Sequence, residues 1–285
     1  MNGSSADIPQ DCTKLEQLEL ELLLEGLYRL YGYDYRHYVR SSVARRVRSR
    51  LAAERLPTIT ALLERVLHDP EAAKRLMNDF SIPVTEMFRD PLFFYAFRTK
   101  VVPILQRLPE VRIWHAGCSS GEEVYSMAMV LEEEGLLAKT KIYATDINES
   151  MLERAREGAF PLNRMQAYTT NYIRSGGQRE FSSYYDSDQV YAYFCPSLIR
   201  NTLFFHHNLV TDRSFNEFHV ILCRNVLIYF DLELQSHVHD LFHDSLAPGG
   251  ILALGSKESL MLTRHRQYYI DLDPQQKIYQ ARKAQ

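Results

Sequence analysis

From residue 91 to the C-terminus, short apolar runs alternate with amphipathic segments, and no other feature of the sequence constrains the fold as strongly. Such alternation is typical of a parallel sheet whose crossover helices pack on its faces. The predicted strands cover 111–117, 141–146, 202–208, 218–223 and 250–255, and the predicted helices cover 122–134, 149–157 and 232–246. We therefore expect an α/β fold here. A turn at 248–250 precedes the last of these strands, and 268–272 with 277–281 predict an antiparallel hairpin at the sheet edge.

The first 80 residues have a helical periodicity instead. Four helices are predicted, at 15–26, 39–51, 59–66 and 70–80, and the first is expected to end near Gly26. A chain of 285 residues corresponds to about two domains at ~150 residues per domain. We predict an all-α N-terminal domain over 1–80, a linker over 81–92 and an α/β domain over 93–285. The stretch 161–201 is rich in Tyr, Ser, Gly and Asn, which indicates an insertion forming a small irregular or β subdomain.

Charge is unevenly distributed within the helical region. Residues 1–28 contain six acidic residues and one lysine, whereas residues 29–55 contain eight arginines and two acidic residues. Over the whole chain, 33 Lys and Arg stand against 36 Asp and Glu, which argues against a surface built throughout for nucleic acid. The basic segment between Arg40 and Arg55 is either a solvated face, partly neutralised by the acidic helix before it, or a docking surface for an acidic partner.

The sequence also bears on location. Nowhere do 18 apolar residues run without a charge, and the first 15 residues lack the basic start and apolar segment of a secretory signal. The four cysteines are far apart and form no Cys-x-x-Cys pair, so neither a zinc ribbon nor a redox motif is indicated. We expect a reducing, cytoplasmic location and no bound metal.

A glycine-containing loop joins the first predicted strand to the next helix. The sequence Ala-Gly-Cys-Ser-Ser-Gly-Glu-Glu occupies 116–123, where doubly wound folds bind a ligand. A dinucleotide site needs the spacing Gly-x-Gly-x-x-Gly and a helix N-terminus open to pyrophosphate. Here the spacing differs, and Glu122 and Glu123 would repel a phosphate. A cationic cofactor without phosphate fits better, and S-adenosylmethionine (SAM) carries a sulfonium and an ammonium group.

Two further polar residues follow predicted strands. Asp146 ends the strand at 141–146, where an acidic residue can accept hydrogen bonds from both ribose hydroxyls. Asn225 follows a later strand and could hold the amino acid part or the adenine edge of the cofactor. Each residue also has a structural explanation, since the glutamates can complement a helix dipole, Asp146 can cap a helix and Asn225 can shape a turn. Their joint position after successive strands favours a site.

Five stretches of the chain resemble the CheR-type chemotaxis receptor methyltransferases, which methylate glutamates of chemoreceptors. The stretches are Thr85-Glu-Met-Phe-Arg-Asp90, Ala116-Gly-Cys-Ser-Ser-Gly-Glu-Glu-Val-Tyr-Ser126, Ala144-Thr-Asp-Ile147, Asn208-Leu209 and Cys223-Arg-Asn-Val-Leu-Ile-Tyr-Phe230. The resemblance covers nearly the whole chain, including the helical N-terminal domain. It implies a SAM-dependent, Rossmann-like methyltransferase domain with a small inserted β subdomain.

The resemblance also implies the residues of the site. By their match to the family's motifs, the SAM contacts would fall on Thr85, Arg89, Glu123, Asp146, Asn208, Leu209, Arg224 and Asn225. Tyr229 matches the family's tyrosine close to the methyl-transfer centre, so Arg89 and Tyr229 are the predicted catalytic residues. The linker at 81–92 would thus contribute to the cofactor site.

The chain departs from the family pattern at three places. Pro83 stands where well-known members have an asparagine two residues before the threonine, which removes one side-chain contact. Residues 255–258 read Gly-Ser-Lys-Glu instead of Gly-His-Ser-Glu. The insertion, with Ser-Gly-Gly at 175–177, differs from that of members that bind a pentapeptide tail of their receptors, so a pentapeptide tether is left open.

Methyl transfer to a glutamate explains why no catalytic triad is evident. An exposed glutamate has a pKa near ~4.3, so its carboxylate is ionised at pH 7 and needs no general base. The enzyme's task is to align the carboxylate oxygen, the methyl carbon and the sulfur. Arg89 is the candidate for orienting the glutamate or shaping the pocket, because a guanidinium can hold a carboxylate through two hydrogen bonds. Tyr229 can donate one weaker hydrogen bond or pack against the methyl group.

The predicted function is therefore that of a protein-glutamate O-methyltransferase whose partner is the cytoplasmic helical domain of a membrane chemoreceptor, bound through the basic segment. No nucleic-acid partner is expected. Two alternatives remain open. One is a non-catalytic adaptor that senses SAM or its product S-adenosylhomocysteine (SAH). The other is a nucleic-acid methyltransferase that uses the arginine-rich helix.

Overall fold

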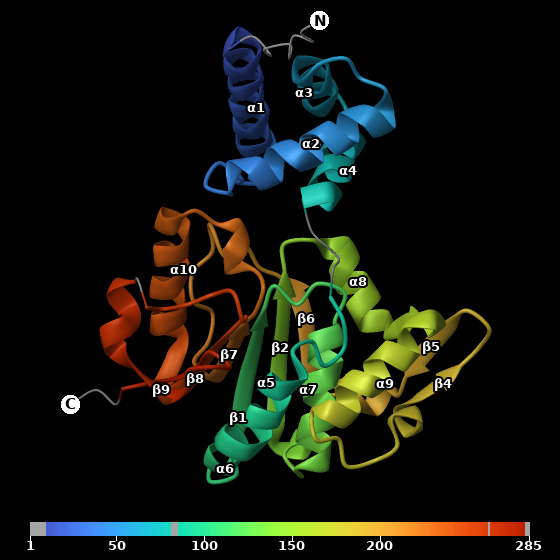
Figure 1. Cartoon of the computed structure of the whole chain (residues 1–285), viewed down its shortest axis with the longest axis vertical. Helices are drawn as coiled ribbons and strands as arrows, with labels where there is room; N and C mark the ends of the chain where they lie inside the picture. The colour runs from blue at the N-terminus through green and yellow to red at the C-terminus, as the bar shows by residue number, and fades with distance from the viewer. Residues whose placement is uncertain (1–9, 81–84, 262, 283–285) are drawn as a thin grey trace, which may run out of the picture. The chain divides into compact units, whose positions relative to one another are not determined.

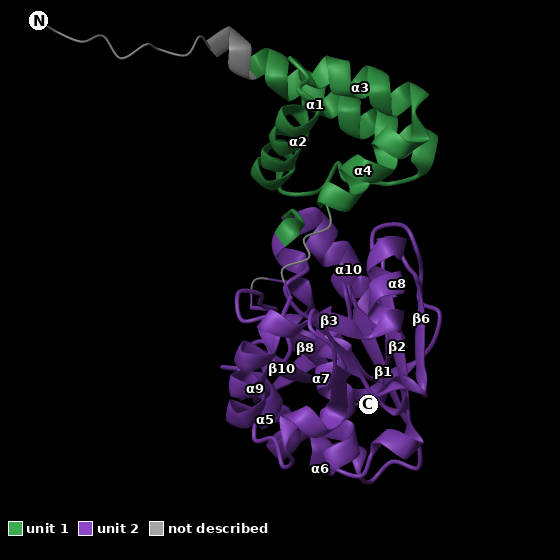
Figure 2. Ribbon diagram, turned by 90° about the vertical axis from the view of Figure 1, so that its right-hand side faces the viewer, with its two compact units in different colours: residues 1–81, 229–231 green, residues 82–228, 232–285 purple. Residues whose placement is uncertain are grey.

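The computed structural model describes residues 10–80, 85–261 and 263–282, with side chains from residue 14 onward. The chain divides into two compact units (Figure 2). Unit 1 comprises Met1–Ser81 together with Tyr229–Asp231, and unit 2 comprises Ile82–Ile228 and Leu232–Gln285. Among the described helices, none is both long enough and apolar enough to cross a membrane.

Unit 1 is all-α, as predicted. Its helices are α1 (Gln10–Tyr31), α2 (Arg40–Glu54), α3 (Ile59–His68) and α4 (Pro70–Phe80). Thr58 caps α3 by accepting a hydrogen bond from the Ala61 amide at 3.1 Å. Apolar side chains at helical spacing, among them Leu23, Leu27, Val47 and Leu62, form its core.

The prediction that the first helix ends at Gly26 is wrong. α1 continues to Tyr31, and Gly26 lies within the helix. A Cβ atom at Gly26 would lie 3.1 Å from the Leu63 side chain of α3. The glycine therefore lets α1 and α3 approach closely, and it does not terminate the helix.

Unit 2 is built on a seven-stranded sheet of order β6-β2-β1-β7-β8-β10-β9 (Figure 1). The strands are β1 (Val111–Ala116), β2 (Thr140–Asp146), β6 (Thr202–His206), β7 (Phe218–Cys223), β8 (Leu246–Leu254), β9 (Tyr269–Asp273) and β10 (Ile278–Ala281). The first five are paired in parallel, whereas β10 is antiparallel to both of its neighbours. The predicted α/β fold and the antiparallel hairpin at the edge are both confirmed.

The turn predicted at 248–250 lies inside β8. Leu246 pairs with Phe218 and Ile251 pairs with Val220, so the residues between Leu246 and Ile251 form a bulge that shifts the register. Gly249, with φ +76°, supplies the backbone conformation that such a bulge needs. The turn residues were thus located correctly, but the strand accommodates them.

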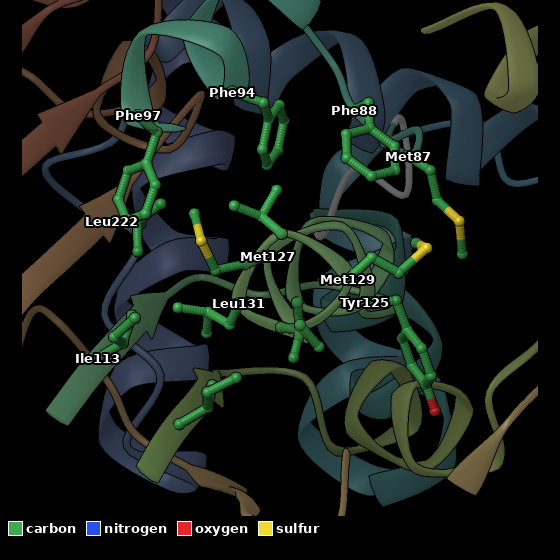
Figure 3. Close-up of a cluster of buried hydrophobic side chains, with 14 of the residues drawn as sticks. Met87, Phe88, Phe94, Phe97, Ile113, Tyr125, Met127, Met129, Leu131 and Leu222 are labelled. Carbon is green, nitrogen blue, oxygen red and sulfur yellow. The ribbon is translucent and has the colours of Figure 1, made fainter. Parts of the chain in front are cut away.

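The principal helices of unit 2 are α5 (Pro91–Ala96), α7 (Glu122–Glu133), α8 (Glu149–Glu157) and α10 (Leu232–Ser245). The five-residue π-helical turn Phe97–Val101 and the short α6 (Val102–Leu105) follow α5 directly. Most residues of α7 are buried. Figure 3 shows Met127 and Leu131 of α7 beside Phe94, Phe97 and Ile113, in a core that includes residues of α5, β1 and β7.

The inserted segment contains a three-stranded antiparallel sheet of order β3-β5-β4. Its strands are β3 (Ala159–Pro161), β4 (Tyr185–Ser187) and β5 (Tyr191–Phe194). It also contains α9 (Met165–Arg174), a helix that was not predicted. Met165, Tyr168 and Tyr172 are buried at helical spacing, and the many polar residues between them obscured this signal.

Candidate active site

The order of the strands identifies where a ligand binds. From β1, the chain continues outward through β2 and β6 on one side, and then returns to β7 and β8 on the other side. In open α/β sheets, ligands bind at the carboxyl ends of the strands, at the point where the strand order reverses. That point lies between β1 and β7 (Figure 1).

The loop between β1 and α7 has a tightly constrained backbone. The amides of Gly117 and Cys118 both donate to the Thr145 carbonyl at 2.8 Å. Gly121 has φ +93°, and a Cβ atom there would lie 2.9 Å from Ala155 Cβ and 3.1 Å from Ala155 Cα. Only glycine meets both conditions without displacing α8. Cys118 is buried in this loop, and burial, together with the nearby Asp146 and Glu123 carboxylates, raises the pKa of its thiol well above the usual value.

Asp146 is held at the carboxyl end of β2. Its Oδ2 accepts a hydrogen bond from the Ser119 amide at 2.8 Å, and its Oδ1 accepts one from the Asn148 amide at 2.9 Å. A carboxylate has about four lone-pair positions, so Asp146 retains capacity to accept a further hydrogen bond. Burial raises the pKa of Asp146, and the backbone hydrogen bonds oppose that rise. The N-cap of α8 is Asn148, so capping does not explain Asp146.

Glu122 and Glu123 begin α7 with different partners. Glu123 Oε1 lies 3.1 Å from His115 Nδ1, and Glu123 Oε2 accepts a hydrogen bond from Arg224 Nη1 at 3.0 Å. Burial alone would raise the pKa of Glu123, but the His115 hydrogen bond and the Arg224 charge hold it below its usual value. Glu122 accepts a hydrogen bond from the Ser120 hydroxyl at 2.7 Å, and burial raises its pKa.

Arg224 follows β7 and joins Glu123 to the segment before α5. Its side chain is only 1% exposed, and Arg224 Nη2 donates to Asp90 Oδ2 at 2.8 Å. Arg224 Nη1 also donates to the Arg89 carbonyl at 3.3 Å, and the guanidinium lies 4.0 Å from the centroid of the Phe93 ring. The hydrogen-bonding capacity of Arg224 is therefore largely directed at other parts of the protein, which suits a positioning residue.

Asn208 and Leu209 lie just after β6, separated from its last residue by His207. His206 in β6 pairs with Asp146 in β2, so these two residues lie at the same sheet edge as Asp146. Asn208 Oδ1 accepts a hydrogen bond from the Val210 amide at 2.9 Å. Both Asn208 and Leu209 are buried.

Asn225 occupies a sharp turn after β7, with φ +65°. Glu258 fixes this turn, since its Oε2 accepts hydrogen bonds from the amides of Asn225 at 3.0 Å and Gly255 at 2.6 Å. A Cβ atom at Gly255 would lie 2.7 Å from the Asn225 nitrogen, so this position requires glycine. The turn explanation for Asn225 is thus correct, and its side-chain role stays a prediction.

Sequence reasoning missed two supporting residues. Glu258 stood in the Gly-Ser-Lys-Glu stretch, which was noted only as a departure from a pattern. His115 lies within β1, where its ring is 1% exposed and contacts Glu123. A polar residue inside an otherwise apolar strand was the available signal.

The remaining predicted residues are located differently. Thr85 and Arg89 are half-buried in unit 2, whereas Pro83 lies outside the described residues, as does the start of the predicted linker. Tyr229 belongs to unit 1, where its carbonyl accepts a hydrogen bond from the Val39 amide at 2.8 Å. The guanidinium of Arg46 lies 5.4 Å from the centroid of the Tyr229 ring.

Fold and site together define a class of protein. Glu123, Asp146, Arg224, Asn225 and the pair 208–209 are all brought to one edge of a mostly parallel sheet, and β10 is inserted antiparallel between β8 and β9. Carboxylates, and not a phosphate-binding glycine pattern, flank the strand-order reversal. This donor set fits a cationic nucleoside without phosphates, which is the chemistry of a SAM-dependent methyltransferase.

Comparisons with known proteins identify the family. Residues 83–275 match the model described as "CheR methyltransferase, SAM binding domain", and residues 18–81 match "CheR methyltransferase, all-alpha domain". The Cher3 protein of Pseudomonas putida is 46% identical over 92% of this chain and 96% of its own length. A chemotaxis protein methyltransferase of Listeria monocytogenes is 28% identical over 81% of this chain and 86% of its own. The chain belongs to the CheR methyltransferase family, and it is a SAM-dependent methyltransferase of the chemotaxis type.

Proposed function

We propose that the protein transfers the methyl group of SAM to glutamate side chains of a cytoplasmic chemoreceptor domain, forming a methyl ester. One observation carries this choice of acceptor. His115 is buried and its Nδ1 contacts Glu123, and Glu123 in turn pairs with Arg224, so neither this histidine nor this glutamate is free to act as a general base. An amine acceptor would need one, because a lysine has a pKa near ~10.4. A glutamate is ionised at pH 7 and does not.

The residues of unit 2 divide the binding of SAM among them. Asp146 accepts a hydrogen bond from the ribose. Asn225 holds the amino acid part or the adenine edge, and Asn208 and Leu209 complete the pocket wall beside Asp146. Arg224 positions Glu123 and the 89–90 segment, and Glu123 keeps its negative charge toward the cationic end of the cofactor. SAM supplies, when bound, a methyl group on a sulfonium, which needs no metal for its transfer.

The protein's own contribution to the reaction is alignment. Arg89 of unit 2 orients the attacking carboxylate through its guanidinium, and the role of Tyr229, which belongs to unit 1, stays a prediction. Holding the reacting atoms in line lowers the barrier by up to several kcal/mol (~7–11 in well-oriented model systems). A guanidinium that paired too tightly with the glutamate would weaken the nucleophile, so Arg89 acts through orientation.

We propose that α2 binds the receptor through its exposed arginines. Arg45 is exposed and makes no ion pair or hydrogen bond with any residue that the structure describes. Arg48 contacts Glu16 at 2.7 Å on the surface. By contrast, Arg46 donates to the Phe80 carbonyl, and Arg50 pairs with Asp79 at 2.6 Å. Arg45 is therefore available to a partner, Arg48 would have to exchange its surface contact with Glu16, and Arg46 and Arg50 maintain the fold of unit 1.

A methyl-transfer assay tests the acceptor chemistry. The protein is incubated with tritiated SAM and a purified cytoplasmic fragment of a chemoreceptor, and the label is then exposed to base. A methyl ester releases its label, so base-labile counts on the receptor support the proposal. Base-stable label on nucleic acid would favour the nucleic-acid methyltransferase, and tight SAH binding without any transfer would favour the adaptor.

Calorimetry with SAH tests the cofactor residues separately. Replacing Asp146 by asparagine halves its acceptor capacity and removes its charge, so we expect the affinity for SAH to fall by about tenfold or more, which is ~1.4 kcal/mol. Asp186→Asn, at an exposed position in β4, is the matched control and leaves the affinity unchanged. Equal affinities for wild type and Asp146→Asn would contradict the assigned pocket.

A further inference from the structure

A cavity of about 490 Å³ lies in unit 2 beside α10, and the site described above does not use it. One face of α10, including Ser236 and His239, forms one wall. Ile228 forms part of another, and the segment after β8, with Lys257, Glu258 and Arg264, completes it. Cavities of ~300–1,000 Å³ with a largely apolar lining and a few polar groups are typical of ligand sites.

The cavity adjoins the cofactor edge through Glu258. This residue lines the cavity, and the same carboxylate accepts the hydrogen bond from the Asn225 amide at 3.0 Å. Ile228 and Leu232, which also line it, immediately flank the segment Tyr229–Asp231 in the sequence. A group bound in the cavity is therefore close to the turn that holds Asn225.

The charges around the cavity leave one cation uncompensated. Lys257 is exposed and makes no ion pair or hydrogen bond with any residue within the described ranges. Arg264 pairs with Asp240, and the Glu258 carboxylate is surrounded by backbone amides. His239 is 1% exposed, and burial together with His265 lowers its pKa to about 4, so its ring is neutral at pH 7.

This combination of an apolar wall and a free ammonium group matches an acidic side chain, which has a short apolar stem and a carboxylate head. The stem can pack against Ile228 while the carboxylate reaches Lys257. A helical substrate presents side chains three or four residues apart on one face, about 5–6 Å from each other. A glutamate that reacts and a second acidic residue on the same face can thus be bound together.

We propose that this cavity binds a second acidic side chain of the protein substrate, adjacent to the glutamate that is methylated. This inference rests on the proposed function. The cavity is then a specificity subsite, in which Lys257 selects acidic sequence context and takes no part in the transfer itself. The cavity has a different role from the exposed arginines of α2. The cavity binds one side chain of the substrate, whereas the arginines attract the receptor as a whole.

The variant Lys257→Gln tests the subsite with a chemoreceptor cytoplasmic fragment and tritiated SAM. We expect KM for the fragment to rise about tenfold, with kcat and the SAH dissociation constant unchanged, because removing an attractive charge weakens the encounter and not the chemistry. The conservative Lys257→Arg is expected to restore KM to within about twofold of wild type, since the charge is kept. Lys141→Gln, at an exposed lysine at the start of β2, is the matched control.

A second variant tests the cavity without changing charge. Ser236→Phe places a ring in the cavity from α10, and we expect KM for the fragment to rise while SAH affinity and the melting temperature stay close to wild type. An unchanged KM in both Lys257→Gln and Ser236→Phe would overturn the subsite. So would a lower kcat with unchanged KM, since Lys257 would then act on the reacting carboxylate. A wild-type protein that transfers no methyl group to the fragment would overturn the proposed function itself.

Discussion

The two ends of α7 carry similar groups of buried charges in different surroundings. At its start, Glu123 meets Arg224 and His115 at the carboxyl edge of the sheet. At its end, Glu133 and the C-cap residue Glu134 meet Arg98 of the π-helical turn at 2.5 Å and 2.9 Å. A glutamate is favoured by the helix dipole at the first end and disfavoured at the second. At the second end, Glu133 has hydroxyl donors in addition to its arginine.

Those donors connect α7 to the inserted subdomain. The hydroxyls of Tyr172 and Tyr184 both donate to Glu133 Oε1, the latter at 2.7 Å. The Glu133 side chain is fully buried, whereas the Glu123 side chain is 19% exposed. A buried ion pair alone thus does not indicate a functional site. Glu123 differs from Glu133 in two respects: it lies at the carboxyl edge of the sheet, and part of its side chain is exposed.

The largest effect is expected at the end of α7. Arg98→Met leaves Glu133 buried without a counter-charge, which costs about 3–5 kcal/mol of unfolding free energy. Urea unfolding measures this loss. The double variant Arg98→Met, Glu133→Gln removes the stranded charge and should recover part of the loss. SAH affinity of the folded Arg98→Met protein should equal that of wild type, and a weakened affinity would show that the two ends are coupled.

A smaller effect is expected at the start of α7, and it concerns ligand affinity instead of stability. Glu123→Gln removes a negative charge beside a cationic ligand and loosens Arg224, so SAM affinity should fall about tenfold, or ~1.4 kcal/mol. Competitive calorimetry against SAH provides the measurement. Glu132→Gln, a partly exposed position on the same helix, serves as the control. Equal losses in both variants would show that the effect comes from the net charge of α7.

The smallest effect concerns how stability at the start of α7 depends on pH. The pKa of Glu123 is lowered in the folded state, so its contribution to stability is complete above the usual value of 4.5 and is lost as the pH falls through the folded pKa. The pKa of Glu122 is raised in the folded state. Its ionised carboxylate therefore destabilises the folded protein above that raised pKa. Below the usual value of 4.5 the carboxyl group is protonated in both states, and this destabilisation disappears.

At pH 7, Glu123→Gln is therefore expected to destabilise the protein and Glu122→Gln to stabilise it, each by roughly 1 kcal/mol or less. Both differences from wild type should shrink when urea unfolding is repeated near pH 4. If both substitutions changed the free energy of unfolding in the same direction at pH 7, then burial, and not the individual hydrogen-bond partners, would control the pKa of both carboxyl groups.

Much of the fold could be predicted from the sequence because local patterns and packing agree there. The bounds of α4, α8 and β7 match the predicted ranges, since Pro70, Asn148 and the run at 218–223 are strong local signals. Gly26 misled the prediction, because its role is the close approach of α3, which depends on a residue far away in sequence. α9 was missed for a similar reason, since its buried tyrosines become apolar contacts only in the folded subdomain.

The same holds for the candidate site: the positions of its residues could be predicted from the sequence, but their contacts could not. Asp146 and Asn225 were predicted from their places after strands, and the glutamates from their place after a glycine loop; their roles in binding stay predictions. The hydrogen-bond partners of these residues could not be predicted, because those of Glu123 come from distant parts of the chain, namely His115 in β1 and Arg224 after β7. Glu258 was missed because its role is to accept backbone hydrogen bonds, which leaves no trace in residue type alone.

Cys118 shows one chemical consequence of this arrangement. A thiolate is a strong nucleophile, and here the sulfur belongs to the very loop that would border a reactive methyl donor. Burial and two nearby carboxylates raise the pKa of the thiol, which disfavours the thiolate that a methyl donor would alkylate. The acceptor that we propose, a glutamate carboxylate, differs from this thiol because it is ionised at neutral pH.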